Sequence, residues 1–320
     1  MKNGGQCEHE ERKMPVVSVV MPSFNHEEFI SEAIESVLGQ DFDDFELIIV
    51  DDASTDSSKQ IIQQYAAEDS RIRAIFHETN GGFSKTMNDG IETAKGEFVA
   101  NLDSDDVWMT DKLSKQLKVL EQNPDLIIWA EGEVVDEKGR LSGQTFSERW
   151  GTTSAKKSGD LWQELLRTNC IFNSSVLYKK QNLGDARYDE EVSYLDDYKL
   201  WLEMARQRHF HYIAEPLAKY RIHSDNWLGG SGPETLKRQR TAGQEYLSIA
   251  EDAMRQYDDE ITRKTRAVIF ARMGSIYYSA GEKKKGLRFF LRAVMCNPFE
   301  KRNFLYPRLA LGRMLDRRLI

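Results

Sequence analysis

Three aspartates follow a short apolar run in the segment VANLDSDDVW, residues 99–108. They are Asp103, Asp105 and Asp106, and burying like charges this close together costs several kcal/mol each unless a positive partner is present. In an extended segment, residues i and i+2 point to the same side, so Asp103 and Asp105 would form an oxygen-rich half-site. Such oxygens suit Mg²⁺ or Mn²⁺ that carries a substrate diphosphate. We therefore predict a divalent-cation site, with a solvated acidic loop as the alternative for so short a pattern.

The elements around these aspartates alternate between strands and helices. This alternation is typical of a parallel sheet with helices on its faces. Polar clusters follow the strands, with the sequences PSFN, DDASTD, HETNGG and DSDD. Because ligands bind at the carboxyl ends of the strands in such sheets, we expect these clusters to meet at one edge. Hydrophobic periodicity predicts strands at 16–21, 45–50, 71–76 and 97–102. It also predicts helices at 27–38 and 85–94, and a third helix that follows Ser54, its expected N-cap.

The chain after residue 110 is less regular. The segment at 138–160 is rich in Gly, Ser, Thr and Lys and predicts a flexible loop, which would act either as a lid or as plain surface. From Thr235 onward the pattern is helical, and residues 269–298 resemble one tetratricopeptide-type hairpin. The other expected elements are a helix at 112–120, a strand at 126–130, helices at 161–166 and 195–205, and a linker at 229–234.

Composition and charge exclude several classes of protein. The 320 residues carry a net charge of −8, which argues against a nucleic-acid partner. Three cysteines without CxxC spacing argue against a zinc site or a disulfide framework and favour a cytoplasmic location. We see no signal peptide, and no apolar run reaches the ~18–20 residues of a membrane span. No G-x-G-x-x-G follows a strand, which argues against a dinucleotide-dependent oxidoreductase.

The final segment, residues 301–320, mixes apolar side chains with arginines. A basic amphipathic stretch of this kind predicts peripheral contact with the inner face of a membrane. The alternative is a capping helix for the repeat-like hairpin, because one such repeat is too small to fold alone. The helical tail also offers a surface for a homo-oligomer.

Several ordered motifs resemble the inverting glycosyltransferases of family 2, which have the GT-A fold. They are VVSVVMPSFN, LIIVDDASTD, NGGFSKTMNDG, AKGEFVANLDSDD, LDDYKLWLEMA and YRIH, and they lie between residues 15 and 223. The resemblance implies an α/β fold of the GT-A nucleotide-diphospho-sugar transferase type. This fold is a Rossmann-like, mostly parallel sheet with flanking helices, and a C-terminal α-helical region follows it here. The implied organisation is a polar tail (1–14), a GT-A domain (15–228) with a nucleotide-binding half (15–125) and an acceptor half (126–228), and a helical region (229–320).

The resemblance also assigns roles to motif residues. It does not say which of Asp51 and Asp52 binds the base and which the ribose. Asp105 is the implied direct metal ligand, with Asp103 and His223 completing the site. For His223, an ordinary surface or core histidine is the alternative. The residues implied in binding the donor are Pro22, Ser23, Phe24, Asn25, Asp51, Asp52, Asn80, Gly82, Asp103 and Ser104.

Two positions depart from the family pattern. Many relatives carry an arginine where this chain has Met87, and we expect Lys85 to supply the missing cation. The segment usually written Glu-Asp reads Asp196–Asp197. Asp197 matches the catalytic base, and Asp196 is the second candidate. The alternative is that both merely start a helix, where carboxylates interact favourably with the helix dipole.

The predicted function is a metal-dependent inverting transfer of a sugar from a nucleotide-diphosphate donor to an acceptor hydroxyl. The donor is most often a UDP-sugar in this family, and Mn²⁺ or Mg²⁺ is the expected cofactor. The expected acceptor is a carbohydrate, a lipid-linked glycan or a protein, as in bacterial cell-surface polysaccharide or glycoconjugate synthesis. Two alternatives stay open: a non-catalytic sugar-nucleotide-binding or scaffold module, and a nucleotidyltransferase.

Overall fold

The computed structural model describes residues 14–224, 226 and 233–300. The N-terminal half is a parallel sheet in which β1 lies between β2 and β4, and β3 lies at the edge. Val17 of β1 pairs with Phe45 of β2 and with Phe98 of β4, so these strands begin at one level. Their carboxyl ends therefore share one edge, and the polar clusters lie there. These strands are β1 (Val17–Ser23), β2 (Phe45–Asp51), β3 (Ile72–Phe76) and β4 (Phe98–Asn101).

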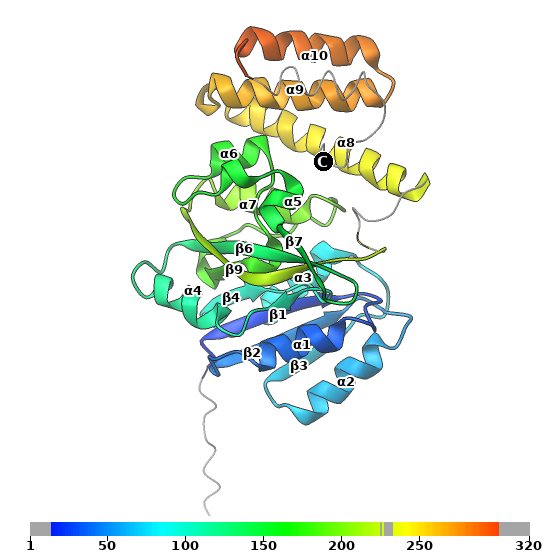
Figure 1. Ribbon diagram of the computed structural model, residues 1–320, viewed down its shortest axis with the longest axis vertical. Coiled ribbons are helices and arrows are strands. Elements are labelled where there is room, and N and C mark those ends of the chain that lie inside the picture. Colours follow the sequence, from blue (N-terminus) through cyan, green and yellow to red (C-terminus); the bar gives the residue numbers. More distant parts are fainter. Residues whose placement is uncertain (1–13, 225, 227–232, 301–320) are drawn as a thin grey trace, which may run out of the picture.

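The same sheet continues with mixed strand directions (Figure 1). β8 joins β4 antiparallel, β6 follows antiparallel to β8, and β9 runs parallel to β6 with β5 antiparallel at its far side. The predicted α/β sheet with flanking helices is confirmed, and its continuous parallel part is the N-terminal half. The added strands are β5 (Val107–Trp108), β6 (Ile127–Asp136), β7 (Leu141–Thr145), which pairs with β6, β8 (Leu177–Lys179) and β9 (Phe210–Ile222).

Helices cover both faces of the sheet because successive side chains of a strand point to opposite faces. Val19 and Met21 pack into one core with α1, α2 and α4, whereas Val20 between them packs into a second core with α3, α6 and α7. Each buried aliphatic side chain contributes about 1.5–3 kcal/mol, so both cores hold β1 rigidly. The helices are α1 (Ile30–Leu38), α2 (Ser58–Glu68), α3 (Phe83–Thr93), α4 (Lys112–Leu120), α6 (Trp162–Arg167) and α7 (Asp196–Met204).

Two local predictions were wrong. Ser54 does not cap α2, because the helix begins only at Ser58. The hydroxyl of Ser54 instead donates a hydrogen bond to Asp51. The segment 138–160 is not an irregular loop, since it forms β7, α5 (Phe146–Trp150) and a short 3-10 turn. A capping box between Thr145 and Glu148 starts α5 by satisfying two backbone N–H groups. The 3-10 turns are η1 (Thr153–Ala155), η2 (Asn173–Ser175), η3 (Lys180–Leu183) and η4 (Asp258–Glu260).

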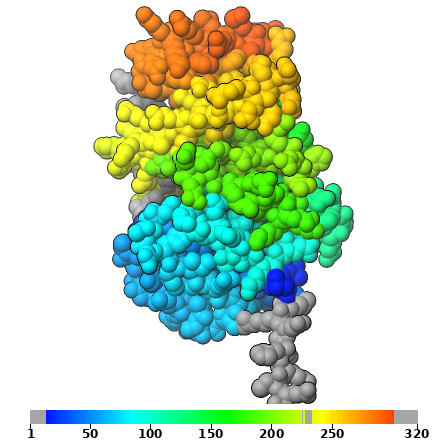
Figure 2. All heavy atoms as spheres, turned by 180° about the vertical axis from the view of Figure 1, so that it is seen from behind, coloured from blue at the N-terminus to red at the C-terminus, as the bar shows by residue number. Residues whose placement is uncertain are grey.

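Three helices form a layer beyond α6 and α7, and α10 is the outermost (Figure 1). The space-filling view from behind shows the same succession of layers from blue to red (Figure 2). Gly274 and Gly286 let α9 and α10 approach closely, since a Cβ on Gly274 would lie 2.6 Å from the Phe290 ring. The tetratricopeptide assignment itself stays a prediction. The helices are α8 (Pro233–Gln256), α9 (Arg263–Ser279) and α10 (Lys283–Cys296), so the end of the expected 229–234 linker is already helical.

Residues 301–320, for which we predicted membrane contact or a capping helix, lie outside the described residues. Among the helices of the described ranges, none combines the length and the apolar composition that a membrane crossing needs.

Candidate active site

A cleft of about 960 Å³ opens at the carboxyl edge of the parallel strands. It brings together most of the residues that the sequence marked, although they come from six separate segments. Of the described residues predicted for the site, Asp51 and Lys85 lie outside its lining. The predicted residues that line it are Pro22, Ser23, Phe24, Asn25, Asp52, Asn80, Gly82, Asp103, Ser104, Asp105, Asp196, Asp197 and His223.

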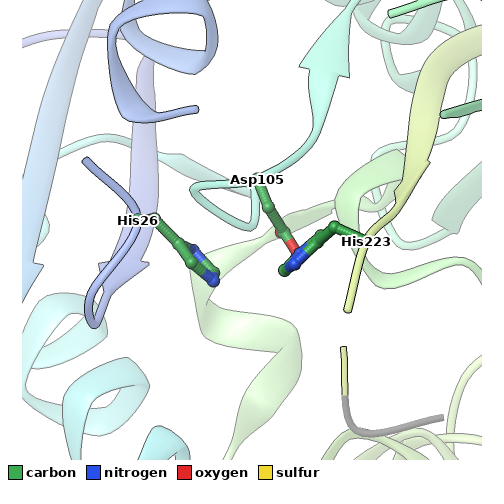
Figure 3. A group of neighbouring side chains, drawn as sticks. All are labelled: His26, Asp105 and His223. Carbon is green, nitrogen blue, oxygen red and sulfur yellow. The ribbon is translucent and has the colours of Figure 1, made fainter. Parts of the chain in front are cut away.

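Three side chains form a candidate cation site: His26, Asp105 and His223 (Figure 3). One ligand atom from each lies within 4.8 Å of the others. His26 comes from the loop after β1, Asp105 from the loop between β4 and β5, and His223 from the residue directly after β9. His223 Nε2 lies 3.0 Å from Asp105 Oδ2, and the two imidazole centroids are 5.5 Å apart. The sequence named two of the three, and His26 was missed although it directly follows PSFN.

Asp105 is held by contacts to its backbone and its carboxylate. Arg221 Nε donates to the Asp105 carbonyl at 2.8 Å, and Asn226 Nδ2 donates to Asp105 Oδ2 at 3.2 Å. Arg221 is buried and also pairs with Glu32 of α1, so the YRIH segment ties this loop to a distant helix. Burial acts to raise the pKa of Asp105, but the hydrogen bond to His223 and the charge of His26 hold this pKa below its ordinary value. The carboxylate is therefore kept ionised, as a metal ligand must be.

The chain turns at Asp105, so the extended geometry assumed for Asp103 and Asp105 was wrong. Asp106 N donates to the Asp103 carbonyl at 3.0 Å, which closes the turn. Asp103 still lines the cleft, but its carboxylate accepts from Asn173 Nδ2 at 2.9 Å. Burial, and then the negative charge of Asp105, raises the pKa of Asp103 to about 7. Asp106 points inward, where it accepts from Ser174 Oγ and from the backbone N–H of Arg221.

The two aspartates after β2 have different environments. Asp51 is buried and its carboxylate accepts from the backbone N–H and the hydroxyl of Ser54, outside the cleft lining. Asp52 lines the cleft and accepts from the N–H groups of Gly81 and Gly82, both at 2.8 Å. Asp52 thus fixes the NGG turn, in which Gly82 has φ +86°, a value that favours glycine.

The loop after β1 carries features that fit a ligand. Ser23 Oγ is buried, and no hydrogen-bond partner for it is found among the described residues. Phe24 lines the cleft with 44% of its surface exposed. Asn25 adopts φ +54° and Ala53, in the adjoining loop, φ +61°. Non-glycine residues in this region cost about 1 kcal/mol or more and are found preferentially at functional sites.

The predicted substitute cation does not enter the cleft. Lys85 pairs with Asp89 one turn further along α3, with Nζ 2.9 Å from the carboxylate. Met87 is fully buried in the core between α3 and the sheet. The chain therefore has no positive side chain from this part of α3 in the lining of the cleft, within the residues that the structure describes.

Asp196 and Asp197 begin α7, and both line the cleft. Asp196 accepts from the backbone N–H of Asp197, and Asp197 accepts from that of Tyr198 and, at 3.4 Å, from Asn169 Nδ2. Burial raises the pKa of Asp197 to about 6, even though these hydrogen bonds oppose the change. Burial and the charge of Asp197 raise the pKa of Asp196 further above its ordinary value. The pair both starts a helix and presents titratable carboxyl groups to the cleft.

Sequence reasoning missed two further groups in the lining. Phe146 and Trp150 come from the segment that we expected to be a loop, and Tyr220 from β9. Arg238 and Arg272 come from α8 and α9 of the C-terminal region. None of these five carries a local signal, since each depends on which elements the fold places around the cleft. Trp108 and Trp201, by contrast, are buried core residues outside the lining.

Comparison with known proteins agrees with this arrangement. Residues 18–180 match the model of "Glycosyl transferase family 2". The chain is 32% identical over 223 residues to an uncharacterized glycosyltransferase of Methanocaldococcus jannaschii, covering 68% of this chain and 75% of that protein. It is 28% identical over 275 residues to the GalNAc(5)-diNAcBac-PP-undecaprenol beta-1,3-glucosyltransferase of Campylobacter jejuni, covering 86% of each.

Two solved structures share the fold. Staphylococcus aureus TarS 1–349 in complex with UDP superposes with a TM-score of 0.56 at 18% identity, covering 94% of each chain. The mannosyltransferase PcManGT of Pyrobaculum calidifontis, in complex with GDP-Man and Mn²⁺, superposes with a TM-score of 0.53 at 16% identity, covering 91% of this chain and 89% of that one. With a family model over half of its length and these relatives, the chain belongs to glycosyltransferase family 2.

Proposed function

We propose that this glycosyltransferase moves a sugar from a nucleotide-diphosphate donor to an acceptor hydroxyl in one inverting, metal-dependent step. The observation that carries the proposal is that one cleft joins a His26–Asp105–His223 cluster to the titratable carboxyl group of Asp197. The cluster is suited to binding a cation, and the carboxyl group of Asp197 is suited to accepting a proton. Transfer of a sugar from a diphosphate needs both, because negative charge grows on one side of the sugar while a proton leaves on the other.

The cation cluster fits Mn²⁺ better than Mg²⁺. Imidazole nitrogens are good ligands for the later divalent metals, whereas Mg²⁺ prefers an octahedron of oxygens. His26 and His223 offer two nitrogens and Asp105 offers an ionised oxygen, with Asp103 as a further carboxylate in the lining. A divalent cation held there would neutralise charge on the departing diphosphate.

The loops after β1, β2 and β3 provide the proposed nucleotide site. Phe24 offers an exposed ring for packing against the base. Ser23 Oγ has no hydrogen-bond partner in the described ranges, and a donor hydroxyl or phosphate would supply one. Asp52, Asn80 and Gly82 line the same part of the cleft. Of the two aspartates after β2, we assign the contact with base or ribose to Asp52, because Asp51 is turned away toward Ser54.

Asp197 is the proposed general base. It takes the proton from the acceptor hydroxyl while the acceptor oxygen bonds to the anomeric carbon and the bond from that carbon to the diphosphate oxygen breaks. The nucleotide diphosphate leaves on the opposite face, which inverts the configuration. A base with a pKa of about 6 is ionised at neutral pH and still accepts a proton readily. Asp196 is less suitable, because burial and the negative charge of Asp197 raise its pKa well above the ordinary value and favour its protonated form.

We infer a UDP-sugar as the donor and a bacterial surface glycan or glycoconjugate as the product. The support is that TarS of the same fold was solved with UDP, and that the Campylobacter relative is named for an undecaprenol-linked acceptor. The proposal also places the protein in the cytoplasm, where nucleotide sugars would reach it. The acceptor sugar depends on the wall formed by α5 to α9, which lies mostly outside the region that the family model matches.

The test combines binding and turnover. In a thermal-shift assay we expect UDP with Mn²⁺ to raise the melting temperature of the wild type, and Asp105→Ala to lose the metal-dependent part. Asp125→Ala, on an exposed loop before β6, is the matched control and should respond like the wild type. Donor consumption should release UDP; release of a nucleotide monophosphate would instead indicate a nucleotidyltransferase. Binding without any turnover across a panel of donors and acceptors would favour the scaffold alternative.

A further inference from the structure

Two arginines of the C-terminal helices line the cleft, and neither has a partner of opposite charge among the described residues. Arg238 belongs to α8 and Arg272 to α9, and both lie outside residues 18–180 of the family match. Arg272 is only 7% exposed. Within the part of the chain that the structure describes, neither guanidinium forms an ion pair or donates a hydrogen bond to the protein, and Nε of Arg272 is buried and unpaired. Burying an unpaired charge is costly unless a ligand offsets it.

Arg272 makes contacts that fix the position of its guanidinium but provide no acceptor for its N–H groups. Its guanidinium carbon lies 3.9 Å from the centre of the Tyr246 ring. This cation–π contact holds the guanidinium plane, but it accepts none of the in-plane N–H groups. Burial raises the pKa of Tyr198, the residue after Asp197, and the positive charge of Arg272 opposes this change. An acceptor for the free donors has to come from the cleft.

We propose that Arg272 and Arg238 form an anion subsite for an acceptor that carries a phosphate or a carboxylate. A guanidinium binds either group with two parallel hydrogen bonds, so both chemistries fit. This inference rests on the proposed transferase function and adds the class of acceptor. Both arginines come from the helical layer that covers α6 and α7, whereas the nucleotide loops lie at the ends of β1 to β3 (Figure 1). The subsite therefore belongs to the acceptor side rather than to the donor diphosphate.

A binding experiment tests the subsite without turnover. The protein is saturated with UDP and Mn²⁺, which fills the donor site, and inorganic phosphate or acetate is titrated by calorimetry. We expect saturable binding of at least one anion to the wild type, weakened about tenfold or more in Arg272→Gln and less in Arg238→Gln. Arg272→Lys, which keeps the charge, should retain part of the affinity. Arg240→Gln and Arg263→Gln, exposed neighbours on α8 and α9, are the matched controls.

A kinetic experiment distinguishes acceptor from donor and phosphate from carboxylate. Neutral aryl glycosides are compared with the same glycosides bearing a phosphate or a carboxylate. We expect the wild type to prefer an anionic member through a lower acceptor KM, and Arg272→Gln to lose this preference at unchanged donor KM. Arg238 is partly exposed, so its variant keeps the test valid if Arg272→Gln folds poorly.

Three results would overturn the inference: equal anion affinity in wild type and Arg272→Gln, an anionic preference that survives both substitutions, or a change in donor KM alone. The last result would assign the anion to the donor. Failure of the proposed function looks different, since the wild type would then release no UDP from any donor, whether or not it binds UDP. The phosphate titration would still report on the subsite in that case.

Discussion

The cleft contains two acidic regions whose supports differ in kind. The loop of Asp103 to Asp106 is cross-linked by side chains from distant parts of the chain, such as Arg221, His223 and Asn173. The pair at 196–197 accepts mainly from backbone N–H groups at the start of its own helix. Positive partners keep the pKa of Asp105 low, whereas burial without a cation raises the pKa of Asp197 to about 6. Asp105 of the first region is therefore kept ionised, whereas Asp197 of the second region has the pKa of a group that exchanges a proton.

One cleft can thus hold carboxyl groups with opposite pKa shifts, although all of them are buried. Charged and hydrogen-bonding partners lower the pKa of Asp105, whereas the partners of Asp197 are too weak to offset its burial. Each of the following substitutions or conditions removes one side of this contrast.

The largest effect is expected from Asp197→Asn. The amide cannot accept the acceptor proton, so the transfer rate should fall by about 10²–10⁴-fold, while UDP affinity with Mn²⁺ stays the same. Asp196→Asn is the matched comparison and should lose less. Steady-state transfer and a separate UDP titration measure the two quantities. If Asp196→Asn were the more damaged variant, the roles of the two aspartates would be reversed.

Arg221→Gln should weaken the cross-linked loop. Arg221 is buried and donates to the backbone carbonyls of Asp105, Asp136 and Glu137, so its loss leaves polar groups unsatisfied. We expect the free energy of unfolding to fall by about 2 kcal/mol in urea titrations. Arg140→Gln removes an exposed ion pair to Asp136 and should change it by no more than about 0.5 kcal/mol. Equal losses would show that Arg221 does not support the loop.

His26→Ala should lower the Mn²⁺ affinity of the UDP-bound protein by about tenfold or more, because it removes one of three clustered donors. His209→Ala, an exposed histidine before β9, provides the control. Asp103→Asn should cost less than His26→Ala, since Asp103 lies outside the three-residue cluster and is held by Asn173. Calorimetric titration with Mn²⁺ ranks the three variants, and the reverse order would make Asp103 the ligand.

The acidic limb of the pH profile should follow Asp197 of the second region. An aspartate with a pKa of about 6 is protonated below that pH and can no longer accept a proton. The value of kcat/KM should therefore be level above about pH 7 and about tenfold lower at pH 5 than at its plateau. The affinity for UDP with Mn²⁺ is measured over the same range. If affinity fell in parallel with the rate, the loss would belong to the cation cluster instead.

The smallest effect is expected from Asn169→Ala. Its amide donates a long hydrogen bond to Asp197, which favours the ionised form of that carboxyl group. Removing it should move the acidic limb of the pH profile upward by about half a unit or less and leave the rate at pH 8 unchanged. Asn123→Ala, on the surface after α4, should leave the profile where it is. A downward shift would contradict the assigned direction.

The local sequence pattern was sufficient to predict the structure where strands and helices alternate regularly. The runs VVSVVM and FELIIV are strands buried on both faces, and strand-end motifs such as DSDD lie at the predicted edge. Prediction failed at residues 138–160, because the polar residues that suggested a loop are also those of the capping box at Thr145. It also failed for His26, because one histidine carries no signal until its neighbours in space are known.

Sequence alone determined the family, the parallel half of the sheet and thirteen of the residues that line the cleft, because hydrophobic periodicity and strand-end motifs are local properties. Only the tertiary structure decided which aspartate lies next to a histidine, which aspartate has its pKa set mainly by burial, and which helices form the wall of the cleft opposite the nucleotide loops. The reason is physical: a pKa, a metal cluster or an unpaired guanidinium such as that of Arg272 depends on distances between segments that are far apart in the chain.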